Sequence, residues 1–157
     1  MQKIDTQLLQ ALQKEAGVSQ RKRQICNFHT EPSDPLQRMV NCLNPGSYVP
    51  PHKHEQPRKR EAFIALTGRL LLIEFDEQGG ILEEALLDPA SETKGAEITP
   101  GRYHTLIALE ENTCVYEVKD GPYDPQTDKQ TAPWAPSEDD PDAAAYLRQM
   151  LHRSTLV

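Results

Sequence analysis

The sequence predicts an all-β protein, an antiparallel sandwich or barrel with a short helix near each end. About seven or eight short strand-like segments follow one another, and turn signals separate them every eight to twelve residues or so. At 157 residues the chain suits one domain with its own core. We therefore expect an N-terminal helix in residues 1–19, a barrel in 20–135, and a C-terminal helix in 136–157 that packs on the same domain.

Each expected element has a local signal. Residues 5–16 have amphipathic helical spacing, and Asp5 or Thr6 can cap them. Residues 18–35 are polar and irregular, and the acidic residues near Pro141 favour the start of a closing helix over 141–153. Strands are expected at 37–43, 47–49, 61–66, 69–75, 81–87, 104–109 and 113–118.

Turn residues indicate how these strands connect. The glycines of residues 76–80 predict a hairpin loop. A second hairpin is expected around residues 110–112, and residues 88–95 read as a polar loop. The proline-rich stretch 121–141 predicts irregular structure, with Tyr123 and Trp134 burying their rings to hold it on the barrel.

Composition excludes several classes of protein. The chain is 37% hydrophobic and 26% charged, which is typical of a folded, soluble protein. It has no run of about eighteen apolar residues, so no membrane span is expected. Its net charge of -7 argues against a nucleic-acid partner. Residues 1–5 lack the apolar centre of a secretory signal, which predicts a cytoplasmic protein.

The three cysteines carry little information by themselves. Cys26, Cys42 and Cys114 are an odd number and have no CxxC spacing. This pattern favours reduced, mostly buried thiols over disulfides or a zinc ribbon.

Three histidines and a glutamate form the candidate site. His52 and His54 lie two residues apart, so an extended strand points both imidazoles to the same face. Glu61 precedes an apolar run, and His104 follows a Pro-Gly turn. The four could ligate Fe(II), Mn(II), Ni(II), Co(II) or Zn(II), among which affinity does not choose. The alternative is that His52 and His54 are rim residues of a barrel that holds no metal.

The spacing of these residues resembles the two motifs of cupins. The first motif reads Gly46, five residues, His52-x-His54, then Glu61, six residues and Gly68, and the second reads Pro100-Gly101-x-x-His104. Further stretches make the chain similar to the WbuC family of cupin fold metalloproteins: Asp34–Met39, Pro50–His54, Glu117–Tyr123, Lys129 and Trp134–Glu138.

The resemblance implies a fold, a cofactor and a setting. The expected fold is a double-stranded β-helix (jelly-roll) barrel. It would hold one divalent transition metal, Zn, Fe, Mn or Ni, through His52, His54, Glu61 and His104. A homodimer is expected because cupins often pair. The family is met near O-antigen and other surface-polysaccharide biosynthesis genes, which implies a carbohydrate or nucleotide-sugar ligand.

The chemistry needs further residues around the metal. Four protein ligands leave two positions of an octahedral ion for a small molecule. Candidate general bases are Glu117, His29 and Tyr103. A phosphate or carboxylate, as on an anionic sugar, could be held by four cationic candidates: Arg38, Arg58, Lys59 and Arg102. The basic cluster 58–60 is otherwise a solvated face.

Three classes of function therefore remain open. The first is a metal-dependent enzyme of the isomerase or epimerase type that acts on a sugar or nucleotide sugar. The second is an Fe(II)-dependent dioxygenase, and the third is a non-catalytic cupin that binds or senses a small ligand. The chain has no P-loop, GxGxxG or GxSxG pattern, so nucleotide hydrolysis, Rossmann and serine-hydrolase functions are not expected.

Overall fold

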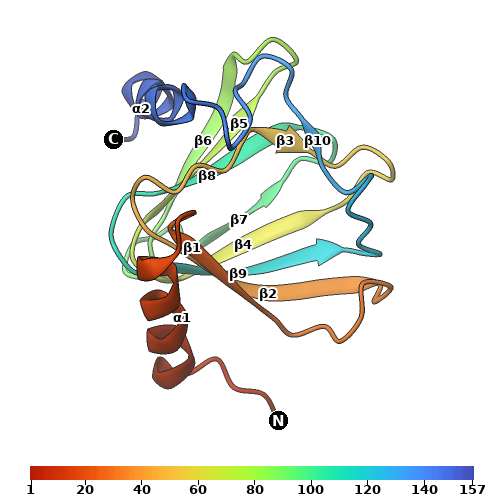
Figure 1. The fold of residues 1–157 in the computed structure, drawn as a ribbon, viewed down its shortest axis with the longest axis vertical. Helices are drawn as coiled ribbons and strands as arrows, with labels where there is room; N and C mark the ends of the chain where they lie inside the picture. The colour runs from red at the N-terminus through yellow and green to blue at the C-terminus, as the bar shows by residue number, and fades with distance from the viewer.

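Two five-stranded sheets form the body of the protein in the computed structural model, which describes residues 1–157 (Figure 1). Across the first sheet, the strands are β1 (Arg23–Asn27), β2 (Leu36–Leu43), β9 (Thr113–Asp120), β4 (Glu61–Thr67) and β7 (Gly95–Ile98). Across the second, they are β10 (Gln130–Thr131), β3 (His52–Lys53), β8 (Tyr103–Ala108), β5 (Leu70–Phe75) and β6 (Ile81–Leu87). All pairings are antiparallel, so the predicted all-β jelly-roll class is confirmed.

The chain repeatedly crosses from one sheet to the other. β4 and β5 follow each other in the chain but lie in different sheets, and the same is true of β8 and β9. The expected hairpin around residues 110–112 is therefore wrong, because β8 pairs with β3 and β5 whereas β9 pairs with β2 and β4. The hairpin at residues 76–80 is confirmed by the pairing of β5 with β6.

Side chains that alternate along the strands fill the space between the sheets at one end of the barrel. These interior residues are fully or nearly fully buried. They are Leu43, Val49, Phe63, Ala65, Leu70, Leu72, Leu87, Ile98, Leu106, Ala108 and Val115. Burial of this apolar area is the main favourable term in folding the barrel.

Each helix covers the outer face of one sheet. α1 (Thr6–Val18) buries Leu12 and Ala16 against the first sheet, and Asp5 caps it by accepting a 3.1 Å hydrogen bond from Leu8 N–H. α2 (Ala143–Arg153) buries Leu147 and Met150 against the second sheet. The predicted helices are thus confirmed with slightly shifted bounds, and in Figure 1 they lie apart from each other on the barrel.

Some segments expected to be irregular contain short strands. β1 lies within residues 18–35, and its five residues all pair with β2. β7 and β10 are likewise short strands that pair with β4 and β3. They lie at sheet edges, where pairing with one neighbour decides the conformation and the local sequence signal is weak.

The two aromatic anchors of residues 121–141 differ. Trp134 packs on Phe75 and Tyr103, with ring centroids 5.2 and 5.8 Å away. Tyr123 is 42% exposed, so it does not anchor the segment by burial. That segment is held instead by polar contacts near Asp128.

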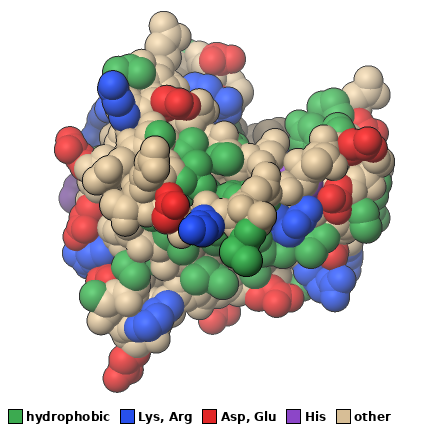
Figure 2. Space-filling model, turned by 90° about the horizontal axis from the view of Figure 1, so that it is seen from below, with side chains coloured by type: hydrophobic (Ala, Val, Ile, Leu, Met, Phe, Trp, Pro, Cys, Tyr) green, Lys and Arg blue, Asp and Glu red, His purple; other side chains and the backbone are tan.

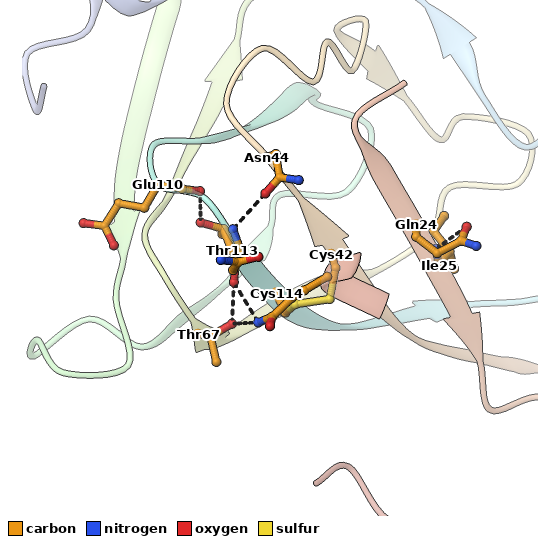
Figure 3. The surroundings of a disulfide bond; sticks show 10 residues. Gln24, Ile25, Cys42, Asn44, Thr67, Glu110, Thr113 and Cys114 are labelled. Carbon is orange, nitrogen blue, oxygen red and sulfur yellow. Dashed lines mark hydrogen bonds between the residues drawn. A yellow bond between two sulfur atoms is a disulfide. The ribbon is translucent and has the colours of Figure 1, made fainter. Parts of the chain in front are cut away.

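The cysteine prediction is wrong for two of the three residues. Cys42 and Cys114 face each other directly on β2 and β9 and form a disulfide (Figure 3). Residues of α1 pack against this pair. Cys26 is free and half-buried. The paired cysteines are 72 residues apart in sequence, so only the register of the two strands reveals that they meet.

Candidate metal centre

Both sheets contribute to a cluster of four buried side chains at the polar end of the barrel interior. The second sheet supplies His52 on β3, His104 directly opposite it on β8, and His54 just after β3. The first sheet supplies Glu61 at the start of β4. One potential ligand atom of each residue lies within 4.8 Å of the other three, and all four side chains are at most 3% exposed.

A backbone carbonyl anchors each imidazole through Nδ1. His52 Nδ1 lies 2.9 Å from Pro50 O, and His104 Nδ1 lies 3.1 Å from Arg102 O. His54 Nδ1 is bonded to Asp128 O. Because a carbonyl oxygen only accepts, each Nδ1 carries the proton and donates it. Each Nε2 is then left with a free lone pair, as in metal-binding histidines.

The Nε2 atoms face a carboxylate that can also only accept. Glu61 Oε2 lies 3.1 Å from His54 Nε2 and 2.9 Å from His104 Nε2. The approach to His104 is not aligned as a hydrogen bond, so this buried Nε2 has no hydrogen-bond partner. Lone pairs that converge in a buried space repel one another unless a cation lies between them. The donor set therefore fits a divalent transition metal.

Charges in the cluster agree with this interpretation. Burial, followed by the nearby Lys129 ammonium, lowers the pKa of His52 well below its usual value, so this imidazole is neutral at pH 7. Imidazole nitrogens together with one carboxylate suit borderline metals.

Asp128 connects the cluster to two buried lysines. Its backbone carbonyl orients His54, while its carboxylate accepts from Lys59 Nζ at 2.5 Å and from Lys119 Nζ at 2.7 Å. Lys59 Nζ also donates to Pro122 O at 2.6 Å. The Asp128 carboxylate is buried, which raises its pKa, but the ammonium of Lys119 and then that of Lys59 lower it below its usual value. These bonds hold residues 121–129 across the end of the barrel.

A polar cavity of about 370 Å³ lies beside the cluster. Strands β1, β2 and β9 and the segment 121–129 form its walls, and its volume is in the range of small-molecule sites. Its lining residues are Ile25, Asn27, His29, Gln37, Met39, Asn41, Glu117, Lys119, Tyr123, Asp128 and Lys129. Lys119 pairs in register with Glu61 across β4 and β9, so the cavity adjoins the cluster.

Of the three candidate bases, two line the cavity. Glu117 is buried and accepts a 3.1 Å bond from Asn41 Nδ2. Burial, followed by the charge of Glu61, raises the pKa of Glu117 to about 7. His29 lies at the wall, with Nδ1 3.1 Å from the backbone of Arg38. Tyr103 points to the outer face of the second sheet, toward Trp134, because it neighbours the inward His104 on β8.

The four cationic candidates do not line this cavity. Arg38 pairs with Asp34 at 3.2 Å, and Arg58 pairs with Glu55 at 2.8 Å in an exposed position. Arg102 is exposed and contributes only its backbone carbonyl, to His104. Lys59 is buried, and its ammonium holds Asp128. The cluster 58–60 thus combines a structural lysine with solvated arginines.

Sequence reasoning did not assign Asn41, Lys119, Asp128 and Lys129 to the site. The spacing of Lys119 two residues after Glu117 on one strand was an available signal for one of them. The other three depend on the strand register and on the path of the irregular segment 121–129.

Solved structures with the same fold have low sequence identity to this chain. A capsular polysaccharide assembling protein, CapF from Staphylococcus aureus, matches at 22% identity with a TM-score of 0.56, covering 68% of this chain and 28% of that one. KdgF from Halomonas sp. matches at 18% identity with a TM-score of 0.52, covering 69% of this chain and 87% of that one. Oxalate oxidase in complex with the substrate analogue glycolate matches at 17% identity with a TM-score of 0.51, covering 74% of this chain and 58% of that one. These likenesses show a cupin-type fold alone.

Sequence comparison defines the family. No match is found among curated protein sequences. No helix is long and apolar enough to cross a membrane. Residues 4–87, which include three of the four cluster residues, match a family described as "Domain of unknown function (DUF6016)". Because this match covers more than half of the chain, the protein belongs to the DUF6016 family.

Proposed function

We propose that this protein is a metal-dependent cupin of the WbuC type that acts on a small carbohydrate or nucleotide sugar in surface-polysaccharide biosynthesis. The metal would be held by His52, His54, Glu61 and His104. The observation that carries the metal assignment is the shared anchoring of the three Nδ1 atoms, which leaves the Nε2 lone pairs of His54 and His104 facing the buried Glu61 carboxylate, with His52 in the same cluster.

The adjoining cavity supports a polar ligand. Most of its lining residues can donate or accept hydrogen bonds, and a purely apolar ligand would leave these groups unpaired. The likeness in fold to CapF, a capsular polysaccharide assembling protein, agrees with a role in polysaccharide formation. We also propose that residues 1–19 and 136–157 belong to one domain with the barrel 20–135, and that the protein is a cytoplasmic homodimer.

The bound metal would polarise a ligand oxygen and so make a neighbouring C–H or O–H proton easier to remove. Glu117 is the residue best placed to accept such a proton, because it is buried at the cavity wall and its pKa of about 7 lets it exchange a proton near neutral pH. Asn41 holds Glu117 through its Nδ2. His29 lies at the cavity wall that follows β1.

The first experiment measures metal content by plasma mass spectrometry on tag-free protein purified without chelator. We expect close to one transition metal per chain, and we expect the His52→Ala variant to lose it. Full metal content in His52→Ala would overturn the assignment. His152→Ala is the matched control, since this imidazole is exposed at the end of α2 and should leave the metal content unchanged.

Turnover separates an enzyme from a binding protein. Glu117→Gln retains the shape of the side chain and the bond from Asn41 but cannot take up a proton. In an enzyme, this variant binds metal and ligand normally and loses turnover. Ligand binding by the wild type without turnover of any carbohydrate tested would instead favour the non-catalytic cupin.

A further inference from the structure

We infer that the cavity selects a small hydroxyl-rich anion, with Lys129 binding its charged group and Asn41 accepting from one of its hydroxyls. This inference rests on the proposed metal site and names the ligand class for it. The first supporting observation is an unused acceptor. Asn41 is 7% exposed and lines the cavity, yet its Oδ1 has no hydrogen-bond partner.

The orientation of Asn41 is set by its other side-chain atom. Nδ2 donates to Glu117 Oε2 at 3.1 Å, so while Glu117 is a carboxylate the amide cannot turn over without losing this bond. Oδ1 therefore needs a donor from a molecule in the cavity. A hydroxyl group supplies one, and it can accept a bond in return from a neighbouring amide, such as that of Asn27 on the same wall.

The second observation is an unpaired cation. Lys129 lines the cavity at an exposed position and forms neither an ion pair nor a hydrogen bond. In contrast, the neighbouring ammonium groups of Lys59 and Lys119 are both held by Asp128. Lys129 is thus the cation at this cavity that is free to bind a ligand as a point charge.

The local charge balance favours an anion. Around the cavity and the cluster, the ammonium groups of Lys59, Lys119 and Lys129 are at least equal in number to the negative charges that Glu61, Glu117 and Asp128 can carry. A divalent ion bound to the cluster leaves the region positive. An anionic ligand would therefore be attracted both to the metal and to Lys129.

The remaining surfaces of the molecule show no comparable feature. Acidic and basic side chains are interspersed across the face in Figure 2, so no continuous basic surface lies there. A second, smaller cavity between β6 and β7 is lined by four glutamates and no cation, and its one unpartnered buried atom, Glu84 Oε1, is a further acceptor, so this cavity offers no positive charge to an anion. The cavity beside the metal cluster combines an unpartnered acceptor, Asn41 Oδ1, with a lysine that has no ion pair.

The test is calorimetric titration of the metal-loaded protein with D-glucuronate, D-glucose 6-phosphate and D-glucose. The three probes share hydroxyl groups and differ in charge, so they separate a carboxylate from a phosphate and both from a neutral sugar. We expect at least one anion to bind about tenfold more tightly than glucose or better, the effect of one charge-assisted contact. Equal binding of glucose and both anions, or no binding of any probe, would overturn the inference.

Variants assign the two contacts. Lys129→Gln should weaken the bound anion about tenfold and leave glucose unchanged, whereas Lys94→Gln, an exposed lysine in the loop before β7, should change neither. Asn41→Leu should weaken all hydroxylated probes. Undiminished anion binding by Lys129→Gln would overturn the role of this lysine, and this exposed substitution leaves the fold intact.

Metal content measured on the same samples keeps the two proposals apart. A wild-type protein that takes up no metal contradicts the proposed function, whatever the titration shows. A protein with a full complement of metal that does not prefer an anion contradicts only the ligand class inferred here.

Discussion

The two ends of the barrel interior are formed by the same strands, but one end buries apolar side chains and the other buries polar and charged ones. On β8, Ala108 and Leu106 face the apolar end, and His104, two residues further, faces the polar end. On β4, Ala65 and Phe63 are followed in the same way by Glu61. Alternation along the strand keeps all of them inside, and residue type alone separates core from site.

The physical consequence is a division of roles. The apolar end gains stability from burial and has no polar group to satisfy. The polar end buries three imidazoles, Glu61, Glu117 and the group of Lys59, Lys119 and Asp128, which costs free energy unless each charge is paired. Sites of this kind are commonly kept for function at the expense of stability.

The largest expected effect on stability is at the apolar end. Phe63→Ala removes a side chain that is 1% exposed and should lower the free energy of unfolding by about 3–5 kcal/mol. Urea unfolding measures it. Ile64→Ala is the matched control, because the next residue on β4 is 49% exposed on the outer face and should cost far less. Equal losses in the two variants would contradict the described core.

At the polar end, a single substitution should lower the affinity for the metal and not the free energy of unfolding of the metal-free protein. Glu61→Gln replaces the carboxylate that faces two lone pairs with an amide that can donate to one of them. We expect metal affinity to fall by more than the 10- to 100-fold or so that loss of an outer partner causes. Without metal, the variant should be at least as stable as the wild type, as measured by urea unfolding after chelation.

A clear loss of stability in metal-free Glu61→Gln would mean that the carboxylate and the imidazoles already stabilise one another without an ion. That result would argue against converging lone pairs and for a protonated, structural histidine cluster.

A smaller effect is expected from the buried ion pairs that support the cluster. Asp128→Asn leaves the backbone carbonyl that orients His54 but frees the Lys119 ammonium, whose register partner is Glu61. This cation should compete with the metal and weaken its binding about 10- to 100-fold in a chelator competition assay.

The double variant Lys119→Met/Asp128→Asn tests the cause. It should recover much of the affinity, because the competing ammonium is gone, and Asp124→Asn in the same segment should have little effect. A double variant as weak as Asp128→Asn would show that Asp128 acts by folding the segment and not by its charge.

The smallest effect is expected at the exposed rim. Arg58→Gln removes a guanidinium that pairs with Glu55 in solvent and lies outside the cavity lining. Metal content should not change, and stability should shift by less than about 0.5 kcal/mol. A marked loss of anion binding in this variant would support the prediction from the sequence that Arg58 helps to bind an anion.

Much of the fold could be predicted because its signals are local. The helices at the two ends, the long strands β2, β4, β5, β6 and β9 and the 76–80 hairpin follow from spacing and turn residues. The short edge strands could not be predicted, because β1 and β7 are stabilised by one neighbouring strand rather than by their own residues. The hairpin expected at 110–112 failed because proximity in sequence does not decide which sheet a strand joins.

The sequence by itself determined the four cluster residues and the class of barrel. His52 and His54 share a face through the two-residue period of a strand, Glu61 precedes an apolar strand, and His104 follows a Pro-Gly turn. These are short-range regularities that any extended backbone imposes.

Only the tertiary structure decided what surrounds that cluster. The disulfide between Cys42 and Cys114, the bonds from Lys59 and Lys119 to Asp128, and the cavity with Asn41 and Lys129 all join residues from distant segments. Their meeting depends on the register of β2, β9 and β4 and on the path of residues 121–129. Such long-range contacts leave no periodic trace in the sequence, because they follow from the packing of the whole chain.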